Sequence, residues 1–290
     1  MNITMKKNSM RKKAILTFCF YTFFCVQWVV AQQYKALVSE DFGTGTREPS
    51  LTPANNIAPG TTTYAAHTTL GNASNASLLD GYYVIGLNSN NFDYYGSYAN
   101  AWQHGGDHTT GSGYMMMINA NPARLGEVNG QYYVYKTSAF DIPGAQYLIT
   151  YWAANLMRFD YNTSDTGPWG NNNGGTFKNG HIGLAIRNNP TGTGTLHGGD
   201  SWILPKAGTA GAPPANNGSG LPWVSKSLSF TLPTTYSSGT PLYFNFYNSD
   251  PYGSSSNAAY GNDLAIDDIV IQMRVVTLTG TIFYDTNSDG

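Results

Sequence analysis

The residues best suited to chemistry in this 290-residue sequence are carboxylates within and beside apolar runs. The segment Gly261–Ile271 carries Asp267 and Asp268 among apolar residues on both parities of a two-residue period, so both faces of the expected strand are covered. A carboxylate buried there needs an ion-pair partner, hydrogen bonds or a cation. In a regular strand these two neighbours point to opposite faces, so at most one of them can enter any single site.

A second pair of carboxylates, Glu40 and Asp41, ends the first expected strand. If the first and last strands of the domain are neighbours, this pair and Asp267 or Asp268 can share one hard cation through oxygen ligands, in a structural role. Without a cation the carboxylates repel each other, and one pKa rises. The alternative is that they are exposed carboxylates at strand ends.

The stretch 102–114 contains two histidines four residues apart, His104 and His108. The glycines between them exclude a helix that would align both rings, which disfavours a zinc site. We expect Asp107 and Thr109 to bond instead to the backbone of a tight turn.

The hexamer at 285–290, Asp-Thr-Asn-Ser-Asp-Gly, matches the first half of an EF-hand-type calcium loop. Asp285, Asn287 and Asp289 fall at ligand positions, and Gly290 permits the sharp turn. Because the downstream ligands are missing, we expect weak or no binding in this chain. The alternative is an ordinary Asp/Asn/Gly turn.

Aromatic side chains are the candidates for stacking on sugar rings. The sequence has 21 tyrosines, most of which we expect in strands, so aromatic residues in loop-like stretches are the better candidates. Core packing is the alternative for each of them. The ligand-binding candidates are Tyr94, Tyr95, Trp102, Trp169 and Trp202.

Signatures of catalysis are missing from the sequence. A glycosidase needs two carboxylates across a cleft, but only three glutamates follow Ala31, namely Glu40, Glu48 and Glu127. The sequence also has no His-Glu-x-x-His helix, Gly-x-Ser-x-Gly elbow, catalytic cysteine or phosphate-binding loop. We therefore predict that the protein is not an enzyme.

Residues 1–31 have the features of an export signal: a basic start, an apolar run over Ala14–Val30, and a cleavage-type ending at Ala31. An uncleaved N-terminal anchor is the alternative. Both cysteines, Cys19 and Cys25, lie inside this segment. An exported protein without disulfides is typical of bacterial secretion, which predicts a secreted or bacterial cell-surface location.

The charge balance after Ala31 disfavours two classes of partner. Ten basic and 17 acidic residues follow that position, which gives a net charge of −7. This balance argues against nucleic acid, and after signal cleavage against an anionic membrane.

Strands must position these residues, because no segment of helical length shows an apolar stripe at 3.6-residue spacing. Short apolar runs between Gly, Pro, Asn and Ser clusters predict an all-β, antiparallel jelly-roll β-sandwich. The nearly all-apolar run Tyr147–Asn155 should be a central strand, and long loops are expected at 43–77, 158–178 and 189–221. The predicted strands are 36–42, 81–87, 113–119, 131–140, 147–155, 180–188, 224–232, 241–248, 264–274 and 277–283.

The expected domain organisation has three parts. A signal peptide covers 1–31 and the sandwich covers 32–274. The start of a truncated second β module, with its partial calcium loop, covers 275–290, so we expect further domains downstream of Gly290 to be missing.

The stretches Asp107–Thr109, Gly113–Met116 and Leu264–Ile269 resemble the hallmark stretches of MAM domains, and Glu40–Gly43 is similar to that family's opening strand. MAM domains are jelly-roll β-sandwiches of extracellular proteins that serve adhesion and recognition. This sequence resembles a distant bacterial, MAM-like or carbohydrate-binding-module-like version without the cysteines common in the animal family. The resemblance implies a bound cation near the chain ends, which would map to Glu40, Asp41, Asp107, Asp267 or Asp268.

The segment Thr279–Gly290 resembles the opening of the calcium-binding B-type repeats of bacterial surface adhesins, which implies calcium at Asp285, Asn287 and Asp289. Together these observations predict a non-catalytic, exported recognition or adhesion module with a structural calcium. Its expected partner is a glycan or a cell-surface protein. The alternative is a carbohydrate-binding module appended to a polysaccharide-degrading enzyme.

Overall fold

The computed structural model describes residues 33–43, 61–67, 78–89, 92, 102–121, 124–137, 142–157, 179–205, 220–237, 239–250 and 262–275. The chain divides into two compact units, and Lys35–Met273 forms the larger one. Of the other unit, only residues 33, 34, 274 and 275 are described. The predicted signal peptide and the predicted calcium loop at 285–290 lie outside the described residues.

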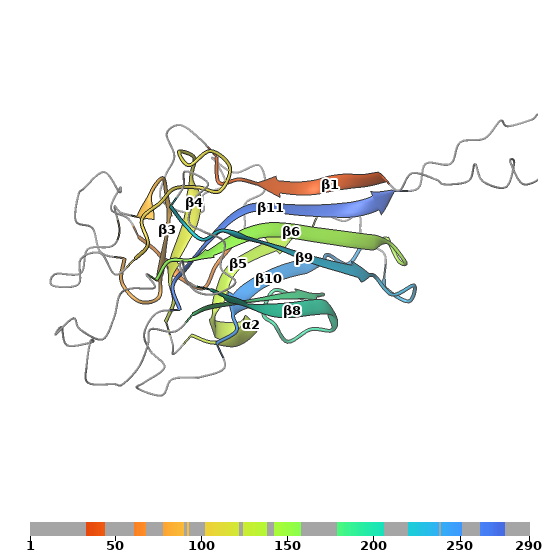
Figure 1. Ribbon diagram of the computed structural model, residues 1–290. Helices are drawn as coiled ribbons and strands as arrows, with labels where there is room; N and C mark the ends of the chain where they lie inside the picture. Colours follow the sequence, from red (N-terminus) through yellow and green to blue (C-terminus); the bar gives the residue numbers. More distant parts are fainter. Residues whose placement is uncertain are drawn as a thin grey trace, which may run out of the picture. The chain divides into compact units, whose positions relative to one another are not determined.

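The larger sheet has seven strands, in the order β2-β3-β4-β11-β6-β9, with β1 also paired to β11 (Figure 1). Its pairs are antiparallel from β3 to β9, and β2 pairs with β3 in parallel. The strands are β1 (Gln33–Glu40), β2 (Ala65–Ala66), β3 (Tyr82–Gly86), β4 (Met115–Asn119), β6 (Gln146–Asn155), β9 (Val224–Thr231) and β11 (Leu264–Val275).

The smaller sheet has four antiparallel strands in the order β5-β10-β7-β8. These are β5 (Gln131–Lys136), β10 (Tyr243–Asn248), β7 (Gly180–Arg187) and β8 (Leu196–Leu204). The single-turn helix α2 (Gly126–Asn129) precedes β5. No helix in the described ranges is long and apolar enough to cross a membrane.

The core lies between the two sheets and is made by alternate residues of their central strands. Tyr147 and Tyr151 of β6 are buried, and they meet Phe244 and Phe246 of β10 at ring-centroid distances of 6.5 and 4.9 Å. The alternation follows from the two-residue period of a strand, since odd residues of β6 and even residues of β10 face each other. These contacts confirm the predicted all-β sandwich and the central position of β6.

A second hydrophobic cluster covers the other face of the larger sheet. Met117, Ala154 and Ala265, from β4, β6 and β11, pack there with Trp102 and Trp223 from the loops. Burial on both faces explains why apolar residues occupy both parities of β11. The sequence prediction that both faces of this strand are covered is confirmed.

Nine of the ten predicted strands correspond to observed ones, and 277–283 lies outside the described residues. The prediction of a loop over 189–221 is wrong in part, because Leu196–Leu204 forms β8. This strand carries Gly-Gly-Asp at its centre and pairs only with β7, so its tertiary partner overrides a poor strand propensity. The predicted loop 43–77 likewise contains β2.

Candidate functional site

Strand β11 changes its neighbour at Asp267 and Asp268. Leu264–Ile266 pair with β4, whereas the ladder to β6 skips from Asp267 to Val270. Asp268 has a φ of 49°, the left-handed conformation of a bulge residue. Strand β6 pairs with one edge of β11 on both sides of this point. The other edge pairs with β4 at Leu264–Ile266, so β1 pairs with that edge beyond β4.

The bulge brings both carboxylates to one residue, His108. The Asp267 Oδ2 atom accepts a hydrogen bond from the His108 backbone N–H at 2.9 Å, and Asp268 Oδ2 lies 2.8 Å from His108 Nδ1. The prediction that the two aspartates point to opposite faces is therefore wrong. It assumed a regular strand, and the positive φ of Asp268 turns its side chain back.

Aromatic rings fix the position of His108. Its ring stacks on Trp152 with centroids 3.6 Å apart and 14° between planes, and it meets the Trp223 ring edge-to-face with centroids 6.1 Å apart. Thr109 adds a hydrogen bond from its hydroxyl to Asp268 Oδ2 at 2.5 Å. We call Asp107, His108, Asp267 and Asp268 the acidic corner.

Asp107 organises the turn that carries His108. Its carboxylate accepts hydrogen bonds from the backbone N–H groups of Thr110 and Gly113 at 2.9 and 2.6 Å, and from the Thr110 hydroxyl. The expectation for Asp107 is confirmed. Thr109 differs, because its hydroxyl bonds to a side chain of β11 and not to the turn backbone.

Asp267 has the most perturbed carboxyl group of the corner. Burial and then the charge of Asp268 raise its pKa to about 8, with a smaller upward contribution from Asp107. Hydrogen bonds from the backbone N–H groups of His108 and Asp268 oppose this rise. A buried carboxyl surrounded by like charges keeps its proton near neutral pH unless a cation replaces it.

The predicted cation ligands are brought together only in part. Asp107, Asp267 and Asp268 converge, but their oxygens face N–H and O–H donors, and no group of three or more potential metal-binding side chains forms among the described residues. Glu40 and Asp41 accept the N–H groups of residues 42 and 43 at 2.9 Å, in local turns. Calcium at these carboxylates stays a prediction.

The predicted neighbourhood of the first and last strands is confirmed, because β1 pairs with β11. The carbonyl of Gly43, just after β1, accepts a hydrogen bond from the Tyr114 N–H at 3.0 Å. This bond ties the end of β1 to the segment that leads from the acidic corner into β4.

The predicted sugar-stacking residues have different locations. Trp102 belongs to the core and not to a ligand surface, because only 4% of it is exposed and its indole N–H donates to Asp263 Oδ2 at 2.8 Å. Trp202 lies in β8 and is half-buried. Tyr94, Tyr95 and Trp169 lie outside the described residues.

Sequence reasoning missed a polar and aromatic surface on the smaller sheet. Because Phe244 and Phe246 face the core, Tyr243, Asn245 and Tyr247 point away from it. We call this side of β5, β10, β7 and β8 the outer face. Both tyrosines are half-buried, and the alternation Tyr-Phe-Asn-Phe-Tyr was the signal available in the sequence.

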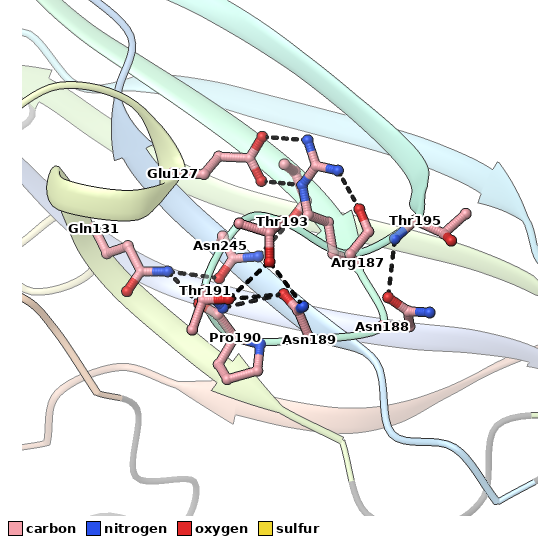
Figure 2. Close-up of polar contacts among 12 residues, drawn as sticks. Glu127, Gln131, Arg187, Asn188, Asn189, Pro190, Thr191, Thr193, Thr195 and Asn245 are labelled. Carbon is pink, nitrogen blue, oxygen red and sulfur yellow. Dashed lines mark hydrogen bonds and ion pairs between the residues drawn. The ribbon is translucent and has the colours of Figure 1, made fainter.

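Amide side chains link the strands of the outer face. Gln131 of β5 donates to Asn245 Oδ1 at 3.2 Å and to the carbonyl of Pro190, in the turn between β7 and β8. Figure 2 shows this turn, residues 188–195, lying beside Asn245 and α2. The contacts hold the turn against the sheet at one side of the outer face.

An ion pair locks the same turn to α2. Arg187 donates through Nε and Nη2 to the two carboxylate oxygens of Glu127 at 2.5 and 2.7 Å, and through Nη1 to the Gly194 carbonyl at 2.5 Å (Figure 2). These charge-assisted bonds raise the pKa of Arg187. Gly192 permits the close approach, because a Cβ there would lie 2.6 Å from Glu127 Cβ.

The two outer tyrosines have different surroundings. Tyr243 lies under the Lys136 ammonium group, 6.0 Å from the ring centroid. Tyr247 covers Gly183, where a Cβ would come within 2.3 Å of its ring. Burial, followed by the charge of Glu127, raises the pKa of Tyr247, so its hydroxyl remains a neutral donor and acceptor.

No protein-family model matches this chain, and no curated protein matches it either. Among solved structures it is similar to a CBM4 carbohydrate-binding module (12% identity, 55% of this chain and 70% of that one, TM-score 0.31). It is similar to the K2 cleaved adhesin domain of Lys-gingipain (16% identity, 81% of this chain and 96% of that one, TM-score 0.33). It is also similar to the CBM22-1–GH10 modules of a Clostridium thermocellum xylanase complexed with xylohexaose (9% identity, 86% of this chain and 30% of that one, TM-score 0.33). At these TM-scores the similarities do not support a functional assignment. The function is therefore inferred from the residues of this chain.

Proposed function

We propose that this chain is a non-catalytic recognition module that binds a glycan on the outer face of its smaller sheet. The observation that carries the proposal is the pair of half-buried tyrosines, Tyr243 and Tyr247, on one side of β10. They are four residues apart, about 13 Å along a strand. Two aromatic platforms at this separation suit an extended chain of sugar rings.

Rigidity supports the same proposal. Asn245 is buried between the tyrosines and bonded to Gln131, and the Arg187–Glu127 pair fixes the adjacent turn. A preformed surface loses little conformational entropy when a ligand binds. Aromatic platforms with a few fixed polar groups are the arrangement expected of a small-ligand site.

Three carboxylates in the described ranges are held in ways that favour binding over hydrolysis. Glu127 uses both oxygens on Arg187, and Asp267 and Asp268 are bonded to the loop that carries His108. Hydrolysis would need one carboxyl to give up a proton to the substrate and another to act as base or nucleophile. Groups held by such partners are poorly placed for either role.

The finer predictions from the sequence are retained as part of this proposal. They are export to a bacterial surface or the medium, a role in adhesion, and a structural calcium. The support for calcium is the like-charge repulsion at Asp267, which a divalent cation would relieve as a proton does. A module that carries a glycan-binding face at a cell surface would serve adhesion through that same face.

The test is a glycan-binding screen with variants of the outer face. The variants Tyr243→Ala and Tyr247→Ala should each weaken binding about tenfold or more, with little change in melting temperature. Tyr34→Ala, which removes an exposed tyrosine on the other sheet, is the matched control and should bind normally. Unchanged binding in both outer-face variants, or no binding to any glycan by the unaltered protein, would overturn the proposal.

A further inference from the structure

Polar side chains gather at the side of the sandwich where β8 and β9 meet, away from the outer face and the acidic corner. These strands end their sheets and contact each other. On β8, Asp200 and Trp202 pair with the core residues Leu184 and Ile182, so they lie on the inner side. On β9, Lys226 pairs with Tyr151 of β6, which also faces inward. We call Tyr151, Asp200, Trp202 and Lys226 the edge site.

The hydroxyl group of Tyr151 is the unusual feature of this site. The side chain is fully buried, with its ring against Phe246 at 4.9 Å and 85° between planes. Its hydroxyl has no hydrogen-bond partner within the described part of the chain. A phenylalanine would fill the same space without burying an unpaired polar group, so the hydroxyl lowers stability.

The Tyr151 ring contacts β8 as well as β10. The Trp202 ring meets the Tyr151 ring at 5.8 Å and 73°, and Asp200 follows on the same side of β8. Besides burial, the charge of Asp200 raises the pKa of Tyr151. Since Trp202 is only half-buried, part of this residue remains accessible to a ligand.

Asp200 and Lys226 are close enough to influence each other without touching. Burial lowers the pKa of Lys226 and the charge of Asp200 raises it, yet the two described side chains form no ion pair. The edge site therefore carries one acceptor, one donor and the Tyr151 hydroxyl, together with the Trp202 indole ring that meets Tyr151. Vicinal hydroxyls of a sugar give and accept hydrogen bonds at once, and its C–H face packs on an aromatic ring.

We propose that the edge site binds one neutral sugar unit, stacked on Trp202 and hydrogen-bonded to the Tyr151 hydroxyl, Asp200 and Lys226. A ligand with a single charge would satisfy one of the two ionic groups and repel the other, so a neutral polyhydroxylated ring fits this set best. The inference takes its class of ligand from the proposed function, but it uses a different part of the sandwich. The module would then have two sugar-binding sites: the outer face for an extended glycan chain and the edge site for a single sugar unit.

The test uses Tyr151→Phe, which removes only the unpaired hydroxyl. It should raise the melting temperature by about 2–4 °C, because a buried unpaired group is lost, and weaken edge-site binding about tenfold or more. Trp202→Ala should abolish that binding. Tyr147→Phe, on the same side of the same strand, is the matched control and should leave sugar binding unchanged.

The measurement separates the two sites by using the double variant Tyr243→Ala/Tyr247→Ala. Its binding to glucose, galactose, mannose and xylose is followed by saturation-transfer NMR and by tryptophan fluorescence. Residual binding that disappears with Tyr151→Phe supports the edge site. Two outcomes overturn the edge site: the double variant binds no sugar, or its residual binding survives the addition of Tyr151→Phe.

The two proposals fail in different ways. Loss of all binding in the double variant, when the unaltered protein binds, leaves the outer face standing and overturns the edge site. Equal binding by the unaltered protein and the double variant, lost with Tyr151→Phe, supports the edge site and overturns the outer face. If the unaltered protein binds no sugar, both are overturned.

Discussion

His108 and Trp152 stack with their ring centroids 3.6 Å apart and 14° between their planes. The stack attaches the loop of the acidic corner to the central strand β6, while the backbone and ring of His108 engage Asp267 and Asp268 of β11. One side chain thereby connects two strands and a loop that lie far apart in the sequence.

We expect His108→Ala to lower the free energy of unfolding by about 1–3 kcal/mol, since it removes the stack and the bond to Asp268. His108→Phe keeps the stacking and loses only the hydrogen bond, so it should cost less than the alanine variant. Urea denaturation of both proteins measures the difference. Equal losses in the two variants would contradict a contribution from stacking.

The pKa of Asp267 predicts a pH dependence of stability. Its folded value is about 8, against 3.8 for the ordinary carboxyl, so the folded protein binds this proton more tightly than the unfolded chain. The contribution is fully present below about pH 3.8 and is lost as the pH rises toward 8. Stability in chelator should therefore fall across this window.

Asp267→Asn should flatten that decline, and Asp41→Asn, an exposed carboxylate near the end of β1, should not. Melting temperatures at five pH values between 4 and 9 compare the variants with the unaltered protein. An unchanged slope in Asp267→Asn would show that this carboxyl keeps an ordinary pKa.

Calcium should raise the melting temperature of the chelated protein if the predicted structural site exists, because a ligand that binds only the folded state stabilises it. The effect should be larger at pH 9 than at pH 6, since Asp267 gives up its proton at about pH 8. Calorimetry with and without millimolar calcium measures it. The absence of any shift at both pH values would remove calcium from the proposal.

The Arg187–Glu127 pair should matter for both stability and binding. Glu127→Gln leaves a mostly buried guanidinium with one strong partner fewer, at a cost of about 2–3 kcal/mol. Arg187→Lys should also destabilise, because an ammonium cannot reproduce the two-pronged contact. Arg124→Lys is the control, since Arg124 donates one exposed bond to a carbonyl. Chemical denaturation and glycan binding are the readouts, and a control as damaging as Arg187→Lys would contradict the special role of the pair.

Gly192→Ala tests the close approach of the turn to α2. Gly192 has a φ of 72°, and a Cβ there would meet Glu127 Cβ at 2.6 Å. Gly239→Ala is the matched control, because its φ is 86° and a Cβ would meet nothing within 4 Å. Conformational strain alone costs about 1 kcal/mol, so Gly192→Ala should be the more destabilising of the two in thermal denaturation. Equal losses would mean that the turn moves away without cost.

The sequence predicted the sandwich because short apolar runs separated by Gly, Pro, Asn and Ser clusters are a local pattern. It missed β8, whose glycines and aspartate form a strand only because β7 supplies the partner. It also assumed a regular strand at Asp267 and Asp268, and a bulge with a positive φ has no reliable local signature in two aspartates.

The candidate sites were predicted less well than the fold, since they depend on which residues meet. The neighbourhood of Asp107, Asp267 and Asp268 was anticipated, but the involvement of His108 was not. Trp102 could not be distinguished from an exposed tryptophan without Asp263, a residue 161 positions away that accepts its indole N–H. The outer face was missed because its tyrosines looked like ordinary strand residues.

The pairing of β1 with β11 has a mechanical consequence. The two strands run in opposite directions, with the beginning of β1 beside the end of β11 (Figure 1). Tension applied through Lys35 and Met273 therefore loads the ladder from one end and breaks its hydrogen bonds one after another, not all at once. The sandwich should open under low force by losing β1 first, while the interlocked rings of β6 and β10 are still in place.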